Sequence, residues 1–315
     1  MVTNEQIKEA ANAIRRGELV AFPTETVYGL GANALDATAV AKIFEMKERP
    51  KFDPLIVHIS SADELDQLVE LVPDRARKLI ERFWPGPLSL VLPKNICVSD
   101  IVTAGLSSVA IRCPAHDVAR DLIRVAGVPI AAPSANIFGA VSPTTAEHVR
   151  QQFGDRLPYI LDAGPCSIGV ESTVVSFVHD PPLLLRPGGV TWEEIETVIG
   201  AVGIGETENA RPISPGQLSR HYSPATRLVL TNDDSHLSPI MRVGLLTLQS
   251  PTTQPGFAAI EILSEKGCLL EAAANLFAAL RRLDAMGLDY IVARPVPEIG
   301  LGRAIMDRLR RAAAN

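Results

Sequence analysis

The sequence has few cysteines and no long apolar run, and both absences narrow the class of protein. Only 4 of its 315 residues are cysteines, and no two of them stand in the Cys-x-x-Cys spacing of zinc and redox sites. We interpret them as scattered reduced thiols. No stretch of about 20 uncharged apolar residues is present, so no membrane span is predicted. The N-terminal segment lacks the basic start and apolar core of a signal peptide, and we expect a cytoplasmic protein.

The familiar signatures of nucleotide and hydrolytic sites are also missing. The sequence contains no GxxxxGKS/T loop, no GxSxG elbow and no HExxH helix, and no catalytic triad is implied. The stretch "GLGRAI", residues 300–305, resembles half a dinucleotide loop. It follows a proline-containing loop rather than a strand, so a nucleotide site there is the less favoured interpretation. The formal net charge of −6 argues against a generally basic nucleic-acid coat, although it leaves room for a local basic patch.

What is present is an alternation of helical and strand-like segments. Up to residue 205 this alternation predicts an α/β domain with a mixed sheet. Residues 206–225 are rich in turn-forming residues and are predicted to be a linker that acts as a lid. Residues 226–315 alternate again and predict a second, smaller α/β domain. Among the individual segments, we predict a helix over residues 63–72 and a strand over residues 159–164.

A basic segment stands at the mouth of a predicted strand. Lys47, Arg49 and Lys51 lie within five residues, between a predicted helix and the strand-like run 55–59. The helix dipole favours bases at a helix C-terminus, which explains some of them. Three bases exceed what capping needs, and guanidinium and ammonium groups are common partners of phosphate. We therefore favour phosphate binding, with capping as the alternative.

Hydroxyl groups gather after a second predicted strand. In "FPTETVYGLGANA", residues 22–34, Thr24, Glu25 and Thr26 precede two glycines. Ligands of open α/β sheets collect outside strand ends, which favours a lip around a small ligand. A polar turn held by side-chain hydrogen bonds explains the same residues. The spacing alone leaves these two interpretations equal.

A third cluster lies in "AAPSANIFGAVSPTTAEHV", residues 131–149. Here hydroxyls precede a predicted helix, whose free N–H groups suit an anion. Ordinary N-capping explains Ser142 or Thr144 alone. It explains Ser134 and Asn136 poorly, so we favour an anion site.

Three shorter motifs complete the set. Ser172 opens a predicted strand in "GVESTVVSF", residues 169–177, and Arg186 ends one in "LLRPGG", residues 184–189. The His-Tyr pair in "SRHYSP", residues 219–224, lies between the two predicted domains and is suited to fold over a site as a lid. Taken singly, none of these motifs defines a site.

Together the motifs resemble those of a known family. "PTETVYGLG", "KERPKFDPLIVH", "PSANIFGAVSPT", "GVESTVV" and "LLRPGG" occur in this order in the YrdC-type threonylcarbamoyl-AMP synthases. "SPGQLSRHYSP" and a second domain ending in "GLGRAIMDRLRRAA" resemble the long form of that family. The resemblance covers nearly the whole chain. It implies a YrdC-like twisted mixed sheet with flanking helices over residues 1–205, and a smaller Rossmann-like domain over residues 226–315.

The resemblance also implies a reaction. Enzymes of this family join L-threonine, bicarbonate and ATP, release pyrophosphate and form threonylcarbamoyl-adenylate. A separate transferase complex then delivers the threonylcarbamoyl group to the adenine beside the anticodon of tRNA. Mg²⁺ is expected to accompany ATP, with few protein ligands. No nucleophile on the protein is needed, because the substrates supply the attacking atoms.

The residues that the family uses fall on defined positions of this sequence. The K-x-R and S-x-N residues, expected to be catalytic, are Lys47, Arg49, Ser134 and Asn136. Nucleotide contacts are expected at Arg49, Asp53, Ser108, Ser134, Ser142, Arg186 and Tyr222. Threonine contacts are expected at Thr26, His58, Arg112, Ser172 and, through its backbone, Ala132. The chain departs from the family at Asp53, where asparagine is more common, at Ser108, where threonine is common, and in "HYSP", which replaces "HYAP".

Two alternative functions stay open. The YrdC fold is similar to RNA-binding proteins, so the chain could bind tRNA or double-stranded RNA without turnover, through bases on one predicted helix: Arg75, Arg77, Lys78 and Arg82. A solvated helix face is the simpler interpretation of those bases. The other alternative is carbamoyl transfer from carbamoyl phosphate, as in the YrdC-like part of hydrogenase-maturation proteins. The acylphosphatase and zinc-finger segments of those proteins are absent here.

Overall fold

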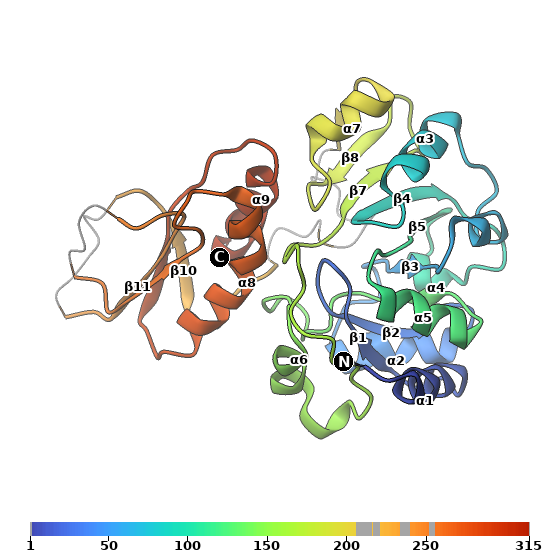
Figure 1. Cartoon of the computed structure of the whole chain (residues 1–315), viewed down its shortest axis with the longest axis horizontal. Helices are drawn as coiled ribbons and strands as arrows, with labels where there is room; N and C mark the ends of the chain where they lie inside the picture. Colours follow the sequence, from blue (N-terminus) through green and yellow to red (C-terminus); the bar gives the residue numbers. More distant parts are fainter. Residues whose placement is uncertain (1, 206–215, 217–220, 234–239, 252–255, 315) are drawn as a thin grey trace.

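The computed structural model describes residues 2–205, 216, 221–233, 240–251 and 256–314 (Figure 1). The predicted linker, residues 206–225, therefore lies outside the described residues except for Gly216 and residues 221–225. The strands form two separate sheets, one on each side of this segment. The two-sheet α/β architecture follows the alternation of the sequence.

The first sheet is mixed. Its nine strands lie in the order β1-β2-β6-β3-β5-β4-β7-β8-β9. β3 runs parallel to β5 and β4 runs parallel to β7, whereas β4 and β5 are antiparallel. This confirms the twisted mixed sheet expected from the sequence. The strands are β1 (Val20–Phe22), β2 (Gly29–Asn33), β3 (Ile56–His58), β4 (Leu88–Pro93), β5 (Ser108–Arg112), β6 (Ile130–Ala131), β7 (Thr173–Ser176), β8 (Leu183–Arg186) and β9 (Gly203–Ile204).

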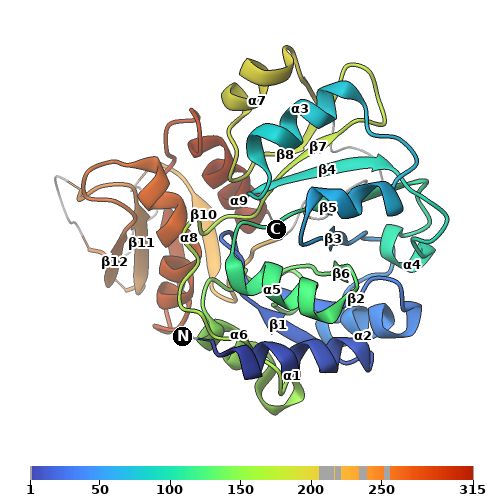
Figure 2. The same cartoon turned by 45° about the vertical axis from the view of Figure 1, so that its right-hand side comes forward.

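Helices cover this sheet with their apolar faces. The first helix begins at a capping box made by Thr3 and Gln6, and it buries Ile7 and Ile14. It packs against α5, as Figure 2 shows. The helices of this part are α1 (Asn4–Arg15), α2 (Ala37–Lys47), α3 (Asp74–Phe83), α4 (Asp100–Thr103), α5 (Asp117–Ala126), α6 (Ala146–Phe153) and α7 (Trp192–Ile199), with the short 3₁₀ turns η1 (Ala62–Gln67) and η2 (Gly154–Arg156).

The helix predicted over residues 63–72 is wrong in its second half. A capping box at Ser61 starts the turn η1, but the turn ends at Gln67. The next residues turn to the sheet: Glu70 donates its backbone N–H to Pro93 O (3.0 Å), and Val69 forms a bridge with Lys94. Pairing with the end of β4 takes the backbone hydrogen bonds that a longer helix needs.

Two strand assignments also differ from the sequence prediction. The strand predicted over residues 159–164 is wrong, because only Ile160 makes a bridge, to Ala21. Conversely, the two glycines of the segment for which a ligand lip and a polar turn were equally favoured belong to a strand, β2. Glycine is required within that strand because a Cβ on Gly31 would lie 2.7 Å from the ring of Phe22. Phe22 belongs to β1, so the close packing of the β1–β2 pair selects glycine there.

The second sheet has four parallel strands in the order β10-β13-β11-β12. These are β10 (Arg227–Leu230), β11 (Val243–Thr247), β12 (Ala259–Ile262) and β13 (Tyr290–Ala293). Helix α8 (Leu269–Asp284) lies between β12 and β13 in the sequence, and α9 (Gly302–Ala313) follows β13. Figure 1 shows α8 and α9 on the side of this sheet that faces the first part. A second, smaller α/β domain is thereby confirmed. Across the described residues, the helices are too short or too polar to cross a bilayer.

The two parts share one hydrophobic cluster. Val141 and Val170 of the first part are buried together with Leu276 and Phe277 of α8. The backbones also approach closely, because a Cβ on Gly169 would lie 2.5 Å from the carbonyl oxygen of Ala273. The interface thus continues the core rather than leaving two loosely tethered domains.

Replacing Gly169 by alanine tests this close approach. Gly169 has φ +77°, and an added methyl would meet the α8 backbone. Gly127→Ala is the matched control, since Gly127 has φ +68° but nothing within 4 Å. The left-handed backbone alone costs about 1–2 kcal/mol in both variants. We expect Gly169→Ala to cost about 1–3 kcal/mol more in urea unfolding. Equal losses of unfolding free energy in the two variants would show that a methyl group on residue 169 meets no resistance from the α8 backbone.

Candidate active site

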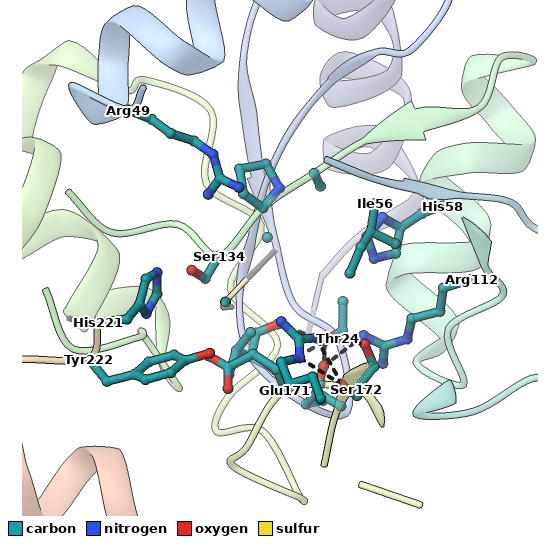
Figure 3. Close-up of a pocket in the computed structure, with 17 residues that line it drawn as sticks. Thr24, Arg49, Ile56, His58, Arg112, Ser134, Glu171, Ser172, His221 and Tyr222 are labelled. Atoms are coloured by element: carbon teal, nitrogen blue, oxygen red, sulfur yellow. Dashed lines mark hydrogen bonds between the residues drawn. The ribbon is translucent and has the colours of Figure 1, made fainter. Parts of the chain in front are cut away.

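A small cavity lies where several strand ends of the first sheet meet the stretch between the two sheets (Figure 3). Its volume is about 40 Å³. Pockets that hold small ligands usually measure about 300–1,000 Å³. Three residues of the intervening stretch, Gly216, His221 and Tyr222, belong to its lining. Its lining consists of Thr24, Thr26, Val27, Gly29, Arg49, Ile56, His58, Arg112, Ala132, Pro133, Ser134, Glu171, Ser172, Arg186, Gly216, His221 and Tyr222.

Most of the residues named from the sequence converge on this cavity. Those that line it are Thr26, Arg49, His58, Arg112, Ala132, Ser134, Ser172, Arg186 and Tyr222. Those that do not line it are Lys47, Asp53, Ser108, Asn136 and Ser142, and all of these are buried. Lys51, the third base of the basic segment, is exposed. The sequence analysis missed Ile56 and Glu171; an acid directly before Ser172 at a strand entrance was the available signal for the latter.

Arg112 lies at the end of β5 with its guanidinium fixed on three sides. Its Nη1 donates to Thr26 Oγ1 (2.9 Å), its Nη2 to Glu25 Oε1, and its Nε to Gly86 O (3.2 Å). Each terminal nitrogen keeps a second N–H. Because Arg112 also lines the cavity, these N–H groups are suited to a carboxylate ligand.

Arg49 reaches the cavity from the loop after α2. Glu48 ends that helix in the left-handed conformation, φ +54°, which turns the chain toward the sheet. Arg49 then donates to Pro54 O (2.9 Å), and its Nη2 lies 2.9 Å from Asp53 Oδ2 as an ion pair without an aligned hydrogen bond. Burial raises the pKa of Asp53, and the nearby Arg49 opposes this shift. The carboxylate therefore compensates Arg49 from behind the wall.

Arg186, at the end of β8, also lines the cavity. Its Nη2 donates to the carbonyl oxygen of Ser172 (2.8 Å) and to Ser172 Oγ (3.1 Å). The Ser172 hydroxyl also shares a hydrogen bond with Ser89 Oγ (2.8 Å). These bonds connect β8 to the entrance of β7 and hold a cation and a hydroxyl on the same wall.

Glu171 connects the cavity to the second domain. Ser142 Oγ donates to its Oε1 (2.6 Å), and Arg308 of α9 donates through Nε to its Oε2 (2.9 Å). The Arg308 side chain is 0% exposed, and its guanidinium also lies 5.1 Å from the ring centroid of Tyr222. Burial by itself would raise the pKa of Glu171, but Arg308 and Arg186 hold it below its usual value of 4.5.

Two histidines line the cavity as neutral groups. Burial, reinforced by Arg112, lowers the pKa of His58 to about 3. Burial and then Arg49 lower the pKa of His221 well below its usual value. Among the described residues, the Nδ1 atoms of both rings lack a hydrogen-bond partner. Each can therefore exchange one hydrogen bond with a ligand without carrying charge.

Tyr222 closes the cavity from the stretch between the domains. It is 1% exposed, has φ +61°, and stacks on Phe277 of α8 with ring centroids 5.6 Å apart. A left-handed backbone is costly for a tyrosine, so this packing must hold it in place. Burial raises the pKa of Tyr222 to about 12, and the phenol remains a hydrogen-bond donor at neutral pH.

Buried basic groups outnumber buried acidic groups around this cavity. Among the described residues, the buried Lys, Arg, Asp and Glu side chains are Lys47, Arg49, Arg112, Arg186 and Arg308 against Glu25, Asp53 and Glu171. All of them lie in the cavity wall or directly behind it. A site of this composition favours an anionic ligand. The fold and the site thus define an α/β protein built to hold an anion, joined to a Rossmann-like domain.

Comparison with known proteins narrows this class to a family. The Sua5/YciO/YrdC family, described as "Telomere recombination", matches residues 12–188. The family "Threonylcarbamoyl-AMP synthase, C-terminal domain" matches residues 190–314. The chain therefore belongs to the two-domain threonylcarbamoyl-AMP synthases, a family of adenylate-forming transferases, and the resemblance found in the sequence is confirmed.

Individual relatives match over nearly their whole length. The threonylcarbamoyl-AMP synthase of Pyrococcus abyssi is 45% identical over 98% of this chain and 94% of its own. That of Bacillus subtilis is 46% identical over 99% of this chain and 94% of its own. The crystal structure of P. abyssi Sua5 complexed with L-threonine superposes with a TM-score of 0.92 at 45% identity, covering 98% of this chain and 94% of that one.

Arg308→Met tests the connection between the domains. It leaves the buried Glu171 carboxylate without its main partner, and breaking a buried pair in this way costs about 3–5 kcal/mol. Arg310→Met is the matched control, because Arg310 is exposed on the same helix and pairs with Glu298 at the surface. We expect that control to cost about 0–1 kcal/mol in urea unfolding. Similar losses in both variants would contradict the assigned pairing.

Glu171→Gln tests the state of the carboxylate. Because the pKa of Glu171 is lowered in the folded protein, its stabilising ionisation is present above pH 4.5 and is lost as the pH falls through the folded value. The difference in unfolding free energy between the native protein and Glu171→Gln should therefore shrink as the pH falls below 4.5. Denaturant titrations between about pH 7 and pH 3 measure it. A difference that stays constant with pH would show that folding does not lower the pKa of Glu171, and one that grows as the pH falls would show that Glu171 is neutral in the fold.

Proposed function

We propose that this protein is an L-threonylcarbamoyladenylate synthase, which condenses L-threonine, bicarbonate and ATP to threonylcarbamoyl-AMP and pyrophosphate. The observation that carries the proposal is the convergence of Arg49, Arg112 and Arg186, with serine and threonine hydroxyls, on one cavity. Three anionic or zwitterionic reactants need charge neutralisation and orientation rather than a protein nucleophile. The solved P. abyssi relative was crystallised with L-threonine, which supports the amino-acid substrate.

The reaction needs two bond-forming steps. The free amine of threonine attacks the carbon of bicarbonate, and a carbamate results with loss of water. If CO₂ derived from bicarbonate reacts instead, the carbamate forms with loss of a proton. A carbamate oxygen then attacks the α-phosphorus of ATP, and the bond from that phosphorus to the bridging oxygen breaks. Pyrophosphate leaves with the electron pair. Each step brings negative charges together, so arginine N–H groups lower both barriers.

The lining residues divide into two groups of roles. We assign the threonine carboxylate to Arg112, which is already held in orientation by Thr26 and Glu25. Further threonine contacts fall on His58, Ser172 and the backbone of Ala132, around the same end of the cavity. The nucleotide contacts fall on Arg49, Ser134, Arg186 and Tyr222. Asp53, Ser108 and Ser142 are buried away from the lining, so their proposed part is to support these groups.

Mg²⁺ is proposed to enter with ATP rather than to occupy a protein cage. Among the described residues, no group of three or more His, Cys, Asp or Glu side chains is suited to a metal ion. Glu171 is the carboxylate that lines the cavity, and both of its oxygens already bind Ser142 and Arg308. These residues fit an ion held chiefly by phosphate oxygens and water, which neutralises phosphate charge. The product is then expected to pass to a tRNA threonylcarbamoyl transferase complex.

Pyrophosphate release from Mg-ATP with bicarbonate tests the proposal. We expect release to require threonine, to fall with serine by about 10- to 200-fold because one methyl group is lost, and to be absent without an amino acid. Arg49→Ala should lower kcat/KM by about 10²–10³-fold. Arg124→Ala, at an exposed arginine of α5, should leave it unchanged. Release that ignores the amino acid, or RNA binding without any release, would overturn the proposal.

A further inference from the structure

Lys47 lies behind the wall of the cavity rather than in it. It is 1% exposed and does not belong to the cavity lining. Its ammonium donates to two backbone carbonyl oxygens, those of Ser134 and Asn136. The side chain therefore points across from the last residue of α2 to the loop that follows β6.

The backbone of Lys47 holds the same loop at a second point. Phe138 donates its N–H to Lys47 O (2.8 Å). Within the loop, Asn136 donates its N–H to Ser134 O (3.0 Å), and its Nδ2 donates to Ile137 O (2.7 Å) and Ala140 O (2.9 Å). Residues 134–140 thus form a compact turn that is attached to the end of α2 through Lys47.

The attached turn carries groups that face the cavity. Ser134 lines it directly. The guanidinium carbon of Arg49 lies over the Phe138 ring, 6.0 Å from the centroid of that ring. The rings of Phe138 and His221 meet edge-on, with their centroids 6.0 Å apart. Any displacement of this turn therefore moves the Ser134 hydroxyl and also the Phe138 ring, against which Arg49 and His221 pack.

A direct contact between Lys47 and phosphate fits this geometry poorly. The ammonium would have to give up two carbonyl acceptors, and both carbonyls would then be left buried without that donor. Burial followed by the neighbouring Arg49 also lowers the pKa of Lys47 well below its usual value, so the group is a weak source of charge for a ligand.

We propose that Lys47 is a positioning residue, which holds the turn 134–138 so that Ser134 faces the nucleotide and Phe138 supports Arg49, and that it makes no contact with substrate. The proposal rests on the proposed function for the identity of the nucleotide. The attachment of the turn is independent of that function and is tested separately.

Hydrogen exchange of the unliganded protein tests the attachment. In Lys47→Met, the amides of residues 134–138 should exchange faster than in the native protein. Lys42→Met is the matched control: Lys42 lies on the same helix and its Nζ also donates to a backbone carbonyl, Gly17 O (2.7 Å), away from the cavity. It should leave residues 134–138 unchanged. Unchanged exchange in Lys47→Met would overturn the proposal, whether or not the protein makes an adenylate.

A double-mutant cycle with Ser134→Ala tests the action through Ser134. We expect Lys47→Met to lower kcat/KM for ATP by about 100-fold in the native background. In the Ser134→Ala background, Lys47→Met should lower kcat/KM by clearly less than about 100-fold, because only the action of Lys47 through Phe138 and Arg49 remains. Losses that multiply would assign Lys47 an independent contact and overturn the proposal. Should the methionine variant fail to fold, Lys47→Gln replaces it in both experiments. Its shorter side chain keeps amide donors, so we expect smaller effects in the same direction, and no effect in either experiment would overturn the proposal.

Discussion

In the part of the chain that the structure describes, five basic side chains are buried around one small cavity, and the fold has to compensate them without water. Two backbone carbonyl oxygens accept hydrogen bonds from Lys47, and a carboxylate forms an ion pair with each of Arg49, Arg112 and Arg308. Arg186 binds the oxygens of Ser172. Among the described residues, three buried acids and the partly buried Asp307, which also pairs with Arg308, stand beside these bases, and this composition favours an anionic ligand. The arrangement orients the guanidinium groups before any substrate arrives, which is what charge-stabilising catalysis requires.

The second domain takes part in this compensation. Arg308 crosses from α9 to Glu171, which in turn receives the hydroxyl of Ser142, while Phe277 of α8 stacks on Tyr222. The shared apolar cluster and the close backbone approach at Gly169 hold α8 and α9 against the first part, so that Phe277 and Arg308 reach Tyr222 and Glu171. The C-terminal domain is thus joined to the catalytic part by a continuous core, and it sets the charge of one wall and the position of the tyrosine that closes it.

Sequence reasoning reached the fold class and most of the cavity, for identifiable reasons. Alternating apolar patterns predicted the two α/β sheets. Residues named from their places beside predicted strands, such as Ser134, Ser172 and Arg186, do lie at one cavity, whereas Arg112 was expected there only from the family resemblance. It failed where long-range packing decides the outcome. Residues 68–70 pair with the end of β4 and the residues after it instead of continuing a helix, and Gly31 is required by the packing of β2 against Phe22.

The distinction between lining and supporting residues was also beyond the sequence. Lys47 and Arg49 are two positions apart in the motif, yet only Arg49 lines the cavity, because the left-handed Glu48 turns the chain between them. Asp53, where the family more often has asparagine, pairs with Arg49 behind the wall and so places its charge away from the cavity. The role of Arg308 could not be predicted from the sequence, since its partner Glu171 is distant in the sequence.

We propose that the cavity joins three substrates at charge-stabilised positions, with bicarbonate as the source of the new carbon. The most direct measurement is mass spectrometry of the adenylate formed from ATP, L-threonine and ¹³C-labelled bicarbonate in the presence of Mg²⁺. The account predicts threonylcarbamoyl-adenylate that carries a single ¹³C atom and forms together with pyrophosphate. An adenylate that stays unlabelled and takes its carbon from added carbamoyl phosphate would contradict it, as would the absence of any adenylate.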